Sequence, residues 1–181
     1  DDSRFMGRPG ASREAIKLAF AFLLTTRGIP LIYYADELAM PGGDDPDNRR
    51  DFPGGWPDDP RSAFTRSGRT PEEEDVFRHV LRLTRLRASC EPLRRGRLVT
   101  LAAGERVYAY ARVTGFEWAI VVLNNGDKPE TVEFSSHPLN LARKLTRLED
   151  RLGGTPARIE AGRIKAELPA KTAAIYTSSK V

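Results

Sequence analysis

The sequence is poor in several features that mark particular classes of protein. Cys90 is the only cysteine in 181 residues, so no disulfide can form within the chain. The longest apolar run, residues 18–24, is much shorter than the roughly 20 apolar residues that span a bilayer, so it predicts a buried helix. Internal repeats and low-complexity tracts are also lacking. A disulfide-built miniprotein is excluded, and nothing indicates a membrane partner.

Charge of neither sign dominates. The chain has 29 Lys and Arg against 25 Asp and Glu, for a net charge of +4. These charges are mixed along the chain, so they form no basic footprint for nucleic acid. Apolar residues make up 40% and charged residues 30%, which is enough for an ordinary packed core. The chain opens on Asp1 rather than Met, so we expect it to be processed or a piece of a longer protein, and its localisation stays open.

The first part of the chain shows helical spacing of apolar residues. Ser12 predicts the N-cap of a helix over residues 12–27, which Gly28 ends. The apolar run at residues 31–34 then predicts a buried parallel strand. Residues 36–69 form a long loop, and loops of that length are usually functional or disordered. Helix, tight turn and strand together make half of a β/α repeat.

A second helix begins at a capping box, with Thr70 as its N-cap and Glu73 bonding back three residues later. Beyond Pro92 the pattern changes to short alternating segments separated by turn formers. The expected strands cover residues 98–102, 106–113, 118–123, 130–134, 145–149, 158–161, 164–168 and 172–177. Ala161-Gly162 predicts a hairpin turn between two of them. Several short strands at this spacing indicate an antiparallel β-sandwich.

Residues 28–56 read GIPLIYYADELAMPGGDDPDNRRDFPGGW. This stretch resembles the end of the catalytic barrel of glycoside hydrolase family 13, the α-amylase family. The family's Tyr-Tyr-Gly-Asp-Glu motif, at the end of the eighth barrel strand, is matched by residues 33–37, with Ala35 in place of the usual Gly. Its Gly-Gly-x-Asp-Pro-x-Asn-Arg pattern is matched by residues 42–49. The resemblance is closest to the cyclomaltodextrinase, neopullulanase and maltogenic-amylase branch.

The resemblance implies an α/β plus all-β fold class. Residues 1–92 would be the last elements of a catalytic (β/α)₈ TIM barrel, and residues 93–181 the C-terminal β-sandwich domain. A barrel needs about 250 residues and a sandwich on the order of 100, so 181 residues are too few for both. We therefore expect a C-terminal fragment whose partner is the missing part of the barrel. Residues 93–181 would fold stably, while the barrel remnant would be partly disordered or completed by another chain.

The resemblance also implies where the catalytic chemistry lies. The family has an Asn-His-Asp motif followed, after two residues, by Arg and an aromatic residue, which Arg4 and Phe5 match if Asp1 is the Asp. Asp2 is the alternative match. That Asp is the third catalytic carboxylate, which holds sugar hydroxyls and favours the distorted ring of the transition state. The nucleophile and the general acid of a retaining glycosidase would come from the fourth and fifth barrel strands, so we expect this chain alone to be inactive.

Five further residues are candidate ligands of an α-glucan. By the family pattern, Asp45 and Arg49 match positions that hold the glucose on the non-reducing side of the cleavage point, where a carboxylate accepts hydroxyl protons and a guanidinium donates. An internal ion pair that only shapes the loop is the alternative. Tyr34 would lie near the cleft. Trp56 and Phe52 could stack on a sugar face, although an anchor in the core of the loop is the preferred interpretation of Trp56.

Other acidic residues of the loop suggest structural roles. Asp36 and Glu37 are of catalytic type, but a structural role at the strand end, bonding loop backbone or Arg, is the preferred interpretation. Asp44, Asp45 and Asp47 suggest calcium in the parent enzyme, but they lack the full Asp-x-Asp-x-Asp-Gly loop. We therefore expect no cofactor and no metal.

The remaining reactive side chains lack partners in the sequence. His79 and His137 have no neighbour at metal-ligand spacing, and Cys90 is better explained as a core residue at a helix end than as a catalytic thiol. Two alternative functions stay open. One is a non-catalytic carbohydrate-binding or structural sandwich, for which Phe116 and Trp118 are the best sugar platforms. The other is an α-glucan transglycosidase.

Overall fold

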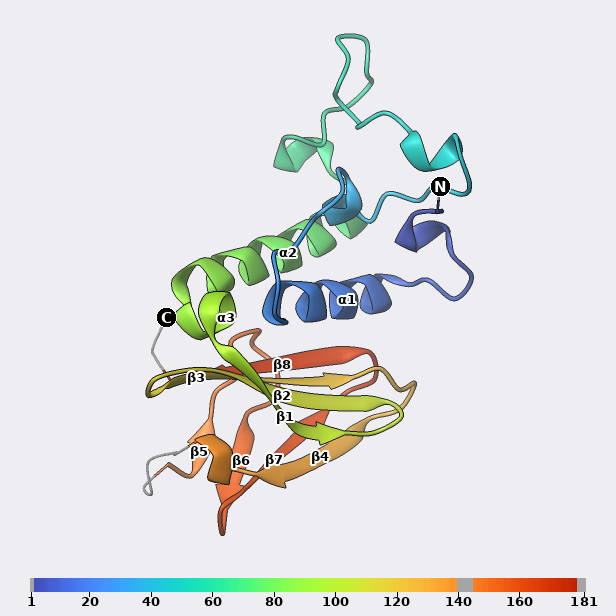
Figure 1. The fold of residues 1–181 in the computed structure, drawn as a ribbon. Coiled ribbons are helices and arrows are strands. Elements are labelled where there is room, and N and C mark those ends of the chain that lie inside the picture. The colour runs from blue at the N-terminus through green and yellow to red at the C-terminus, as the bar shows by residue number, and fades with distance from the viewer. Residues whose placement is uncertain (1, 140–144, 179–181) are drawn as a thin grey trace. The chain divides into compact units, whose positions relative to one another are not determined.

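A computed structural model describes residues 2–139 and 145–178 (Figure 1). The helices are α1 (Arg13–Thr25), α2 (Pro71–Ser89) and α3 (Glu91–Arg95), with short 3-10 helices η1 (Phe5–Gly7), η2 (Asp36–Leu38), η3 (Asp47–Arg49), η4 (Arg66–Gly68) and η5 (His137–Leu139). The strands are β1 (Arg97–Ala103), β2 (Val107–Thr114), β3 (Glu117–Asn124), β4 (Glu130–Ser135), β5 (Arg147–Leu148), β6 (Ala157–Glu160), β7 (Arg163–Leu168) and β8 (Thr172–Thr177). None of the described helices is long and apolar enough to cross a membrane.

Contacts divide the chain into two compact units. The first unit consists of Asp1–Lys17 and Pro30–Leu81, and the second of Leu18–Ile29 and Arg82–Val181. The division passes through α1 and α2, so it differs from the expected domain boundary after residue 92, which stays a prediction.

Both expected helix starts are confirmed. The amide of Ala15 donates to the Ser12 hydroxyl at 3.1 Å, so Ser12 is the N-cap of α1. At the start of α2, the amide of Glu73 donates to the Thr70 hydroxyl at 3.2 Å, and the Thr70 amide donates to the Glu73 carboxylate at 2.9 Å. These reciprocal bonds satisfy two amide donors that the first turn of a helix otherwise leaves open.

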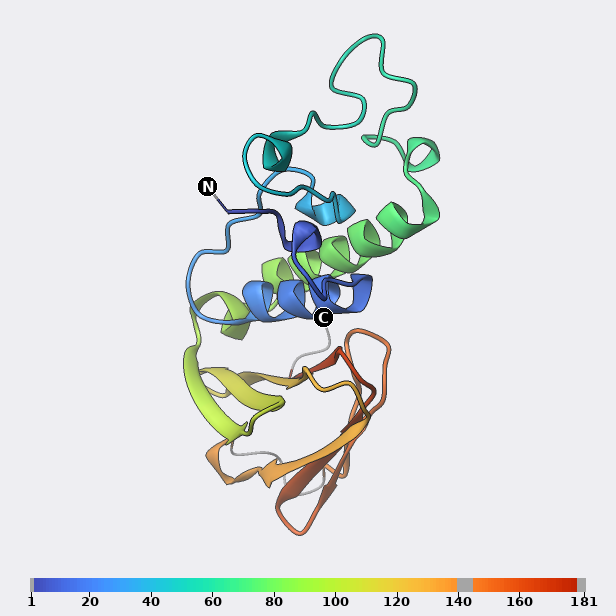
Figure 2. The same ribbon diagram turned by 90° about the vertical axis from the view of Figure 1, so that its right-hand side faces the viewer.

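The expected antiparallel sandwich is also confirmed. One sheet has the order β1-β2-β3-β8 and the other β4-β7-β6-β5, and the two form separate layers in both views (Figures 1 and 2). The hairpin between β6 and β7 turns at Ala161 and Gly162, with φ of 47° and 77°, as a two-residue turn with two positive φ angles requires. The strand expected over residues 145–149 is shorter, since β5 covers Arg147–Leu148, and α3 was not predicted.

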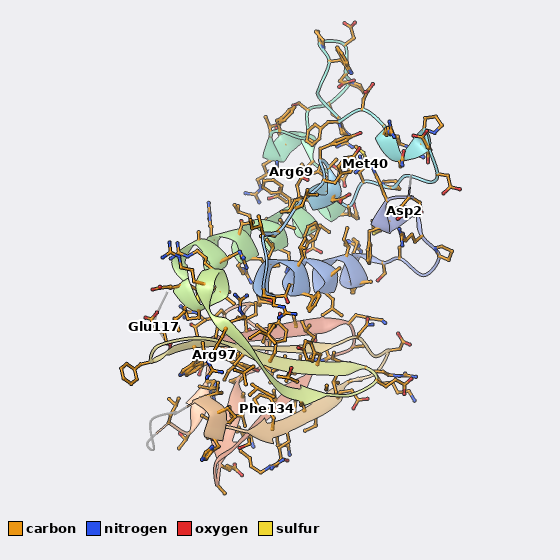
Figure 3. The ribbon with its side chains drawn as sticks, in the orientation of Figure 1. Asp2, Met40, Arg69, Arg97, Glu117 and Phe134 are labelled. Carbon is orange, nitrogen blue, oxygen red and sulfur yellow. The ribbon has the colours of Figure 1, made fainter. Side chains whose placement is uncertain are left out.

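Alternation of side chains places an apolar core between the two sheets. In β7, Ile164, Ala166 and Leu168 are buried while the residues between them are exposed. Phe134 on the neighbouring β4 points into the same core and is 2% exposed (Figure 3). This period-2 pattern is what makes a sandwich readable from sequence.

The β1-β2-β3-β8 sheet is covered on its outer face too. Along β3, every residue from Trp118 to Asn124 is buried, so both faces of that strand are away from water. On the outer face, Tyr110 meets Phe22 edge-on at 6.3 Å, and its hydroxyl lies 2.5 Å from that of Thr25. The second unit therefore includes the C-terminal half of α1 as a covering layer.

The prediction of a buried strand at residues 31–34 is wrong. These residues pair with no strand among the described residues, and Leu31 is 78% exposed. A strand exists only through hydrogen bonds to a neighbouring strand, and the strands of the described chain all pair within the sandwich. The apolar run identifies a segment suited to burial but cannot supply the neighbour that would bury it.

Candidate functional site

The candidate site lies on the long loop of the first unit, directly after a tight turn. Ala35 is fully buried and adopts φ 65°, and Ala39 adopts φ 56°, on either side of η2. This left-handed conformation is costly for any residue with a Cβ and is the one that glycine adopts freely. It explains why a glycine is the usual residue at the position of Ala35 in the motif that the sequence resembles.

Arg4 fixes the loop around this turn. Its side chain is buried, and its Nε donates to the Asn48 carbonyl at 2.7 Å. Its Nη1 donates to the Tyr34 carbonyl at 2.8 Å and to Asp36 Oδ1 at 3.1 Å. The guanidinium also lies over the rings of Tyr33 and Tyr34, 4.7 and 4.5 Å from their centroids. Arg4 therefore bonds three residues that are 30 to 44 positions away from it in the sequence.

Burial is the main influence on the pKa of the two carboxyl groups after the turn. Burial raises the pKa of Asp36, and the nearby Arg4 guanidinium offsets only part of that rise. Burial likewise raises the pKa of Glu37, against hydrogen bonds from backbone amides. The ion pair with Arg4 agrees with the structural role expected for Asp36, whereas Glu37 has no ion-pair partner among the described residues.

Asp45 and Arg49 face one another on the exposed side of the loop. Arg49 Nε lies 3.1 Å from Asp45 Oδ1, and both side chains are more than half exposed, at 57% and 52%. The two alternatives from the sequence are therefore compatible, because an ion pair that is this accessible can shape the loop and still meet a ligand.

The neighbouring Asp47 and Arg50 form the loop's scaffold. Arg50 donates to both oxygens of the Asp47 carboxylate, at 2.6 and 2.8 Å, and the Gly43 amide donates to the same carboxylate at 2.6 Å. Asp47 therefore offers few free lone pairs to a cation. Among the described residues, no group of three or more His, Cys, Asp or Glu side chains could hold a metal ion.

Tyr34 and Trp56 differ in how the loop holds them. The Tyr34 hydroxyl donates to the Arg50 carbonyl at 2.9 Å, directly beside Arg49 in the sequence. Trp56 is 63% exposed, and its backbone is held by Asp59: the Trp56 amide donates to Asp59 Oδ2 at 3.1 Å, and its carbonyl accepts from the Asp59 amide at 3.2 Å. The preferred interpretation of Trp56 as an anchor in the loop core is therefore wrong, and its ring is accessible to a ligand.

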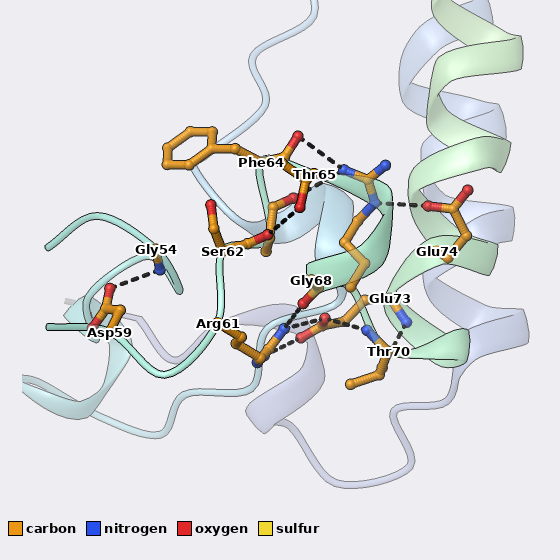
Figure 4. Close-up of polar contacts among 12 residues, drawn as sticks. Gly54, Asp59, Arg61, Ser62, Phe64, Thr65, Gly68, Thr70, Glu73 and Glu74 are labelled. Atoms are coloured by element: carbon orange, nitrogen blue, oxygen red, sulfur yellow. Dashed lines mark hydrogen bonds and ion pairs between the residues drawn. The ribbon is translucent and has the colours of Figure 1, made fainter. Parts of the chain in front are cut away.

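Two arginines tie the end of the loop to the start of α2 (Figure 4). Arg61 donates to both oxygens of the Glu73 carboxylate at 2.6 Å and to the Gly68 carbonyl at 2.8 Å. Arg69 donates to Glu74 at 2.7 Å and to the Ala63 carbonyl at 2.9 Å. The capping-box glutamate thus has a second role as the anchor of Arg61, which the sequence pattern did not indicate.

Some predicted candidates lie away from this loop or outside the described residues. Asp1 lies outside the described residues, and its alternative, Asp2, has a side chain that is 95% exposed. The His79 ring contacts the Lys17 carbonyl at 3.0 Å. Cys90 is buried, and burial raises the pKa of its thiol, so it lacks the character of a reactive thiolate.

No family model matches the sequence. A cyclomaltodextrinase of Geobacillus thermopakistaniensis is 33% identical over 130 residues, which is 71% of this chain and 20% of that protein. A debranching enzyme from Nostoc punctiforme has a similar fold, with a TM-score of 0.76 and 29% identity over 97% of this chain and 33% of that one. An α-amylase from Geobacillus thermoleovorans, solved with acarbose, gives a TM-score of 0.72 and 27% identity, over 92% of this chain and 33% of that one.

The chain thus spans about a fifth of the curated relative and a third of each solved enzyme. The likeness nevertheless extends over most of this chain, 71% of it in sequence and 97% of it in fold. The chain belongs to the α-amylase family of glycoside hydrolases, family 13.

Proposed function

We propose that the chain is the C-terminal portion of an enzyme that acts on α-glucans, namely starch, maltooligosaccharides or cyclomaltodextrins. The observation that supports this most directly is the exposed Asp45–Arg49 pair, at 3.1 Å, on a loop that Arg4 holds in place. A carboxylate and a guanidinium side by side can accept from and donate to neighbouring sugar hydroxyls. Tyr34 and the exposed Trp56 add aromatic surface to the same loop.

The parent enzyme would use a retaining double displacement. A carboxylate nucleophile forms a glycosyl-enzyme, and a second carboxyl group first protonates the leaving oxygen and then activates water. We place both groups outside this chain. Asp1 would supply the third carboxylate, which stabilises the distorted sugar ring, and the loop would hold the substrate on one side of the cleavage point.

The missing part of the barrel would be the natural partner of residues 31–34. This segment pairs with no strand among the described residues and exposes Leu31 and Tyr33, at 78% and 43%. Exposed apolar residues on an unpaired extended segment favour pairing with a neighbouring strand. In the parent enzyme, this segment would become the eighth strand of the barrel.

Binding and hydrolysis together test the proposal. In titration calorimetry we expect the chain to bind maltoheptaose, and Asp45→Ala to weaken binding about tenfold through lost charged hydrogen bonds. Phe116→Ala, on the sandwich, is the matched control and should bind normally. Reducing-sugar assays should detect no hydrolysis by the chain alone. Hydrolysis by the chain, or normal binding by the Asp45 variant, would contradict this assignment.

An autonomous carbohydrate-binding sandwich is the weaker alternative. Of the two aromatic residues that could have formed its platform, Trp118 is buried in the core and only Phe116 is exposed. A transglycosidase would use the same loop with a sugar in place of water as the acceptor, so product analysis of the longer enzyme separates it from a hydrolase.

A further inference from the structure

The first unit contains an apolar groove that Asp45 and Arg49 do not line and that shares Tyr34 with the proposed substrate contacts. Its volume is about 620 Å³, within the range of small-molecule sites. Four aromatic side chains line it together with Leu38, Ala63, Glu37 and Arg69, and the aromatic residues are Tyr34, Phe52, Phe64 and Phe77.

Phe64 presents an open aromatic face at this groove. Its side chain is 68% exposed, and its ring packs on the half-buried Phe52 with centroids 4.5 Å apart. The backbone beneath it is fixed, because the Ala63 amide donates to the Pro53 carbonyl at 2.9 Å and Arg69 donates to the Ala63 carbonyl at 2.9 Å. An aromatic ring on a rigid base loses little conformational entropy when a ligand stacks on it.

The polar groups of the groove select among possible ligands. The Arg69 guanidinium is already engaged by Glu74 and lies 3.9 Å from the centroid of the Phe77 ring. The Glu37 carboxyl also lines the groove and has no ion-pair partner among the described residues. A purely apolar segment would bury this carboxyl with backbone amides as its donors and no opposite charge to balance it, which is costly. A cationic side chain that reached Glu37 would also meet the positively charged Arg69 in the same groove, so a cationic ligand is disfavoured.

A neutral polyol with an apolar face meets both requirements. The C–H groups on one face of a pyranose carry partial positive charge, which suits the negative face of an aromatic ring. Its hydroxyl groups can donate to a carboxylate. Tyr34 connects the groove with the substrate loop, since its ring lines the groove while its hydroxyl donates to the carbonyl of Arg50, next to Arg49.

We propose that this groove holds a further sugar ring of the bound α-glucan, stacked on Phe64 and hydrogen-bonded by Glu37. The inference rests on the proposed function, because it takes the ligand to be the same glucan that Asp45 and Arg49 bind. It assigns Phe64 and Glu37 to substrate binding, and it leaves the chemical step to other residues.

Titration of the whole chain with maltoheptaose tests the inference. Phe64→Ala should raise the dissociation constant about tenfold, since the stacking contact is lost. Phe64→Trp, which keeps an aromatic face, should restore binding to within about threefold of wild type. Glu37→Gln should weaken binding by about threefold to tenfold, because a charged acceptor becomes neutral. Phe116→Ala is the matched control for removing an exposed phenylalanine elsewhere.

The possible outcomes separate this inference from the proposed function. If Asp45→Ala weakens binding while Phe64→Ala and Phe116→Ala both match wild type, only the groove assignment is overturned. If Phe64→Ala lowers the thermal midpoint but leaves the dissociation constant unchanged, the groove is a packing surface and the assignment is also overturned. If wild type binds no maltoheptaose, the proposed function fails, and the groove assignment fails with it.

Discussion

The loop of the first unit and the sandwich of the second are stabilised by different kinds of contact. Between the two sheets of the sandwich, apolar side chains from β2, β3, β4, β6, β7 and β8 form one continuous core. Around the loop, a buried apolar cluster of the described residues contains Ala35, Leu38 and Ala63, and arginine side chains that donate to carbonyls and carboxylates hold the segments together. The difference corresponds to function, because a loop fixed by polar contacts can leave aromatic and charged side chains exposed to a ligand.

Among the described residues, Arg4 of the first unit and Arg112 of the second are both buried, and they are used differently. Arg4 pairs with the Asp36 carboxylate as well as with two carbonyls. Arg112 donates to the carbonyls of Gly96, Thr25 and Thr26 and has no carboxylate partner among the described residues. Burial lowers the pKa of Arg112, with a further contribution from nearby Arg87. In both units the guanidinium satisfies backbone carbonyls that would otherwise be buried without a donor.

The largest expected effect tests the apolar side of this comparison. Phe134→Ala should lower the free energy of unfolding by about 3–5 kcal/mol, because it leaves a cavity between the two sheets. Urea denaturation followed by circular dichroism measures the change. Phe116→Ala, which removes a ring that is 97% exposed, should change stability little. Equal losses in both variants would mean that the sandwich core is not the main stabilising element of the second unit.

The second prediction tests the polar side. Arg4→Met should lower the free energy of unfolding by about 2–3 kcal/mol. The carbonyls of Asn48 and Tyr34 and the Asp36 carboxylate lose their donor in this variant. Hydrogen exchange should show faster opening of the first unit, with amides of the sandwich unaffected. Arg8→Met is the matched control, since that side chain is 54% exposed. A uniform loss of protection in both units would contradict the idea that Arg4 stabilises the loop locally.

The sequence predicted the second unit far better than the loop, for a physical reason. Inward and outward residues alternate along β7 and turn formers separate the strands, so a local pattern encodes each element of the sandwich. The contacts of Arg4 join residues that are 30 to 44 positions apart and leave no local pattern. The wrong strand prediction at residues 31–34 has the same cause. The local sequence shows an apolar run, but whether that run forms a strand depends on other segments that pair with it.

The candidate site was predicted in part. A match to family motifs indicated Asp45, Arg49 and Tyr34, and the aromatic ring indicated Trp56; their proposed contacts with sugar stay predictions. Phe64 carries no motif and follows no periodic pattern, so only its exposure beside the groove made it visible. The family motif usually has glycine where this chain has Ala35, and that glycine indicates a left-handed turn. Ala35 adopts the left-handed conformation in this chain.

A smaller effect is expected at the capping box that ends the loop. Thr70→Ala should destabilise the first unit by about 1 kcal/mol, because the Glu73 amide loses its acceptor. Thr70→Ser keeps the hydroxyl and should retain most of the stability, as measured by urea denaturation. If the serine variant were as unstable as the alanine variant, the contribution of Thr70 would come from its methyl group rather than from its hydrogen bond.

The smallest expected effect concerns the pH dependence of the first unit. Burial raises the pKa of Glu37 above its ordinary value of 4.5, so the folded chain binds this proton at a higher pH than the unfolded chain. The resulting stabilisation is fully present below the unfolded pKa and is lost as pH rises through the folded pKa. Glu37→Gln keeps the shape but never ionises, so its stability relative to wild type should increase as pH rises from about 4 to 7.

Urea denaturation of both proteins across this range measures that difference, and Glu14→Gln, at an exposed site of the same unit, corrects for the general effect of removing a negative charge. A relative stability of Glu37→Gln that falls with rising pH would mean that the ionised carboxylate is stabilised in the folded loop. Glu37 would then have an unrecognised hydrogen-bond donor or cation beside it, and its carboxylate would be less available to the hydroxyl groups of a sugar. The sign of this small effect therefore tests whether the polar contacts of the loop leave a carboxyl group free for a ligand.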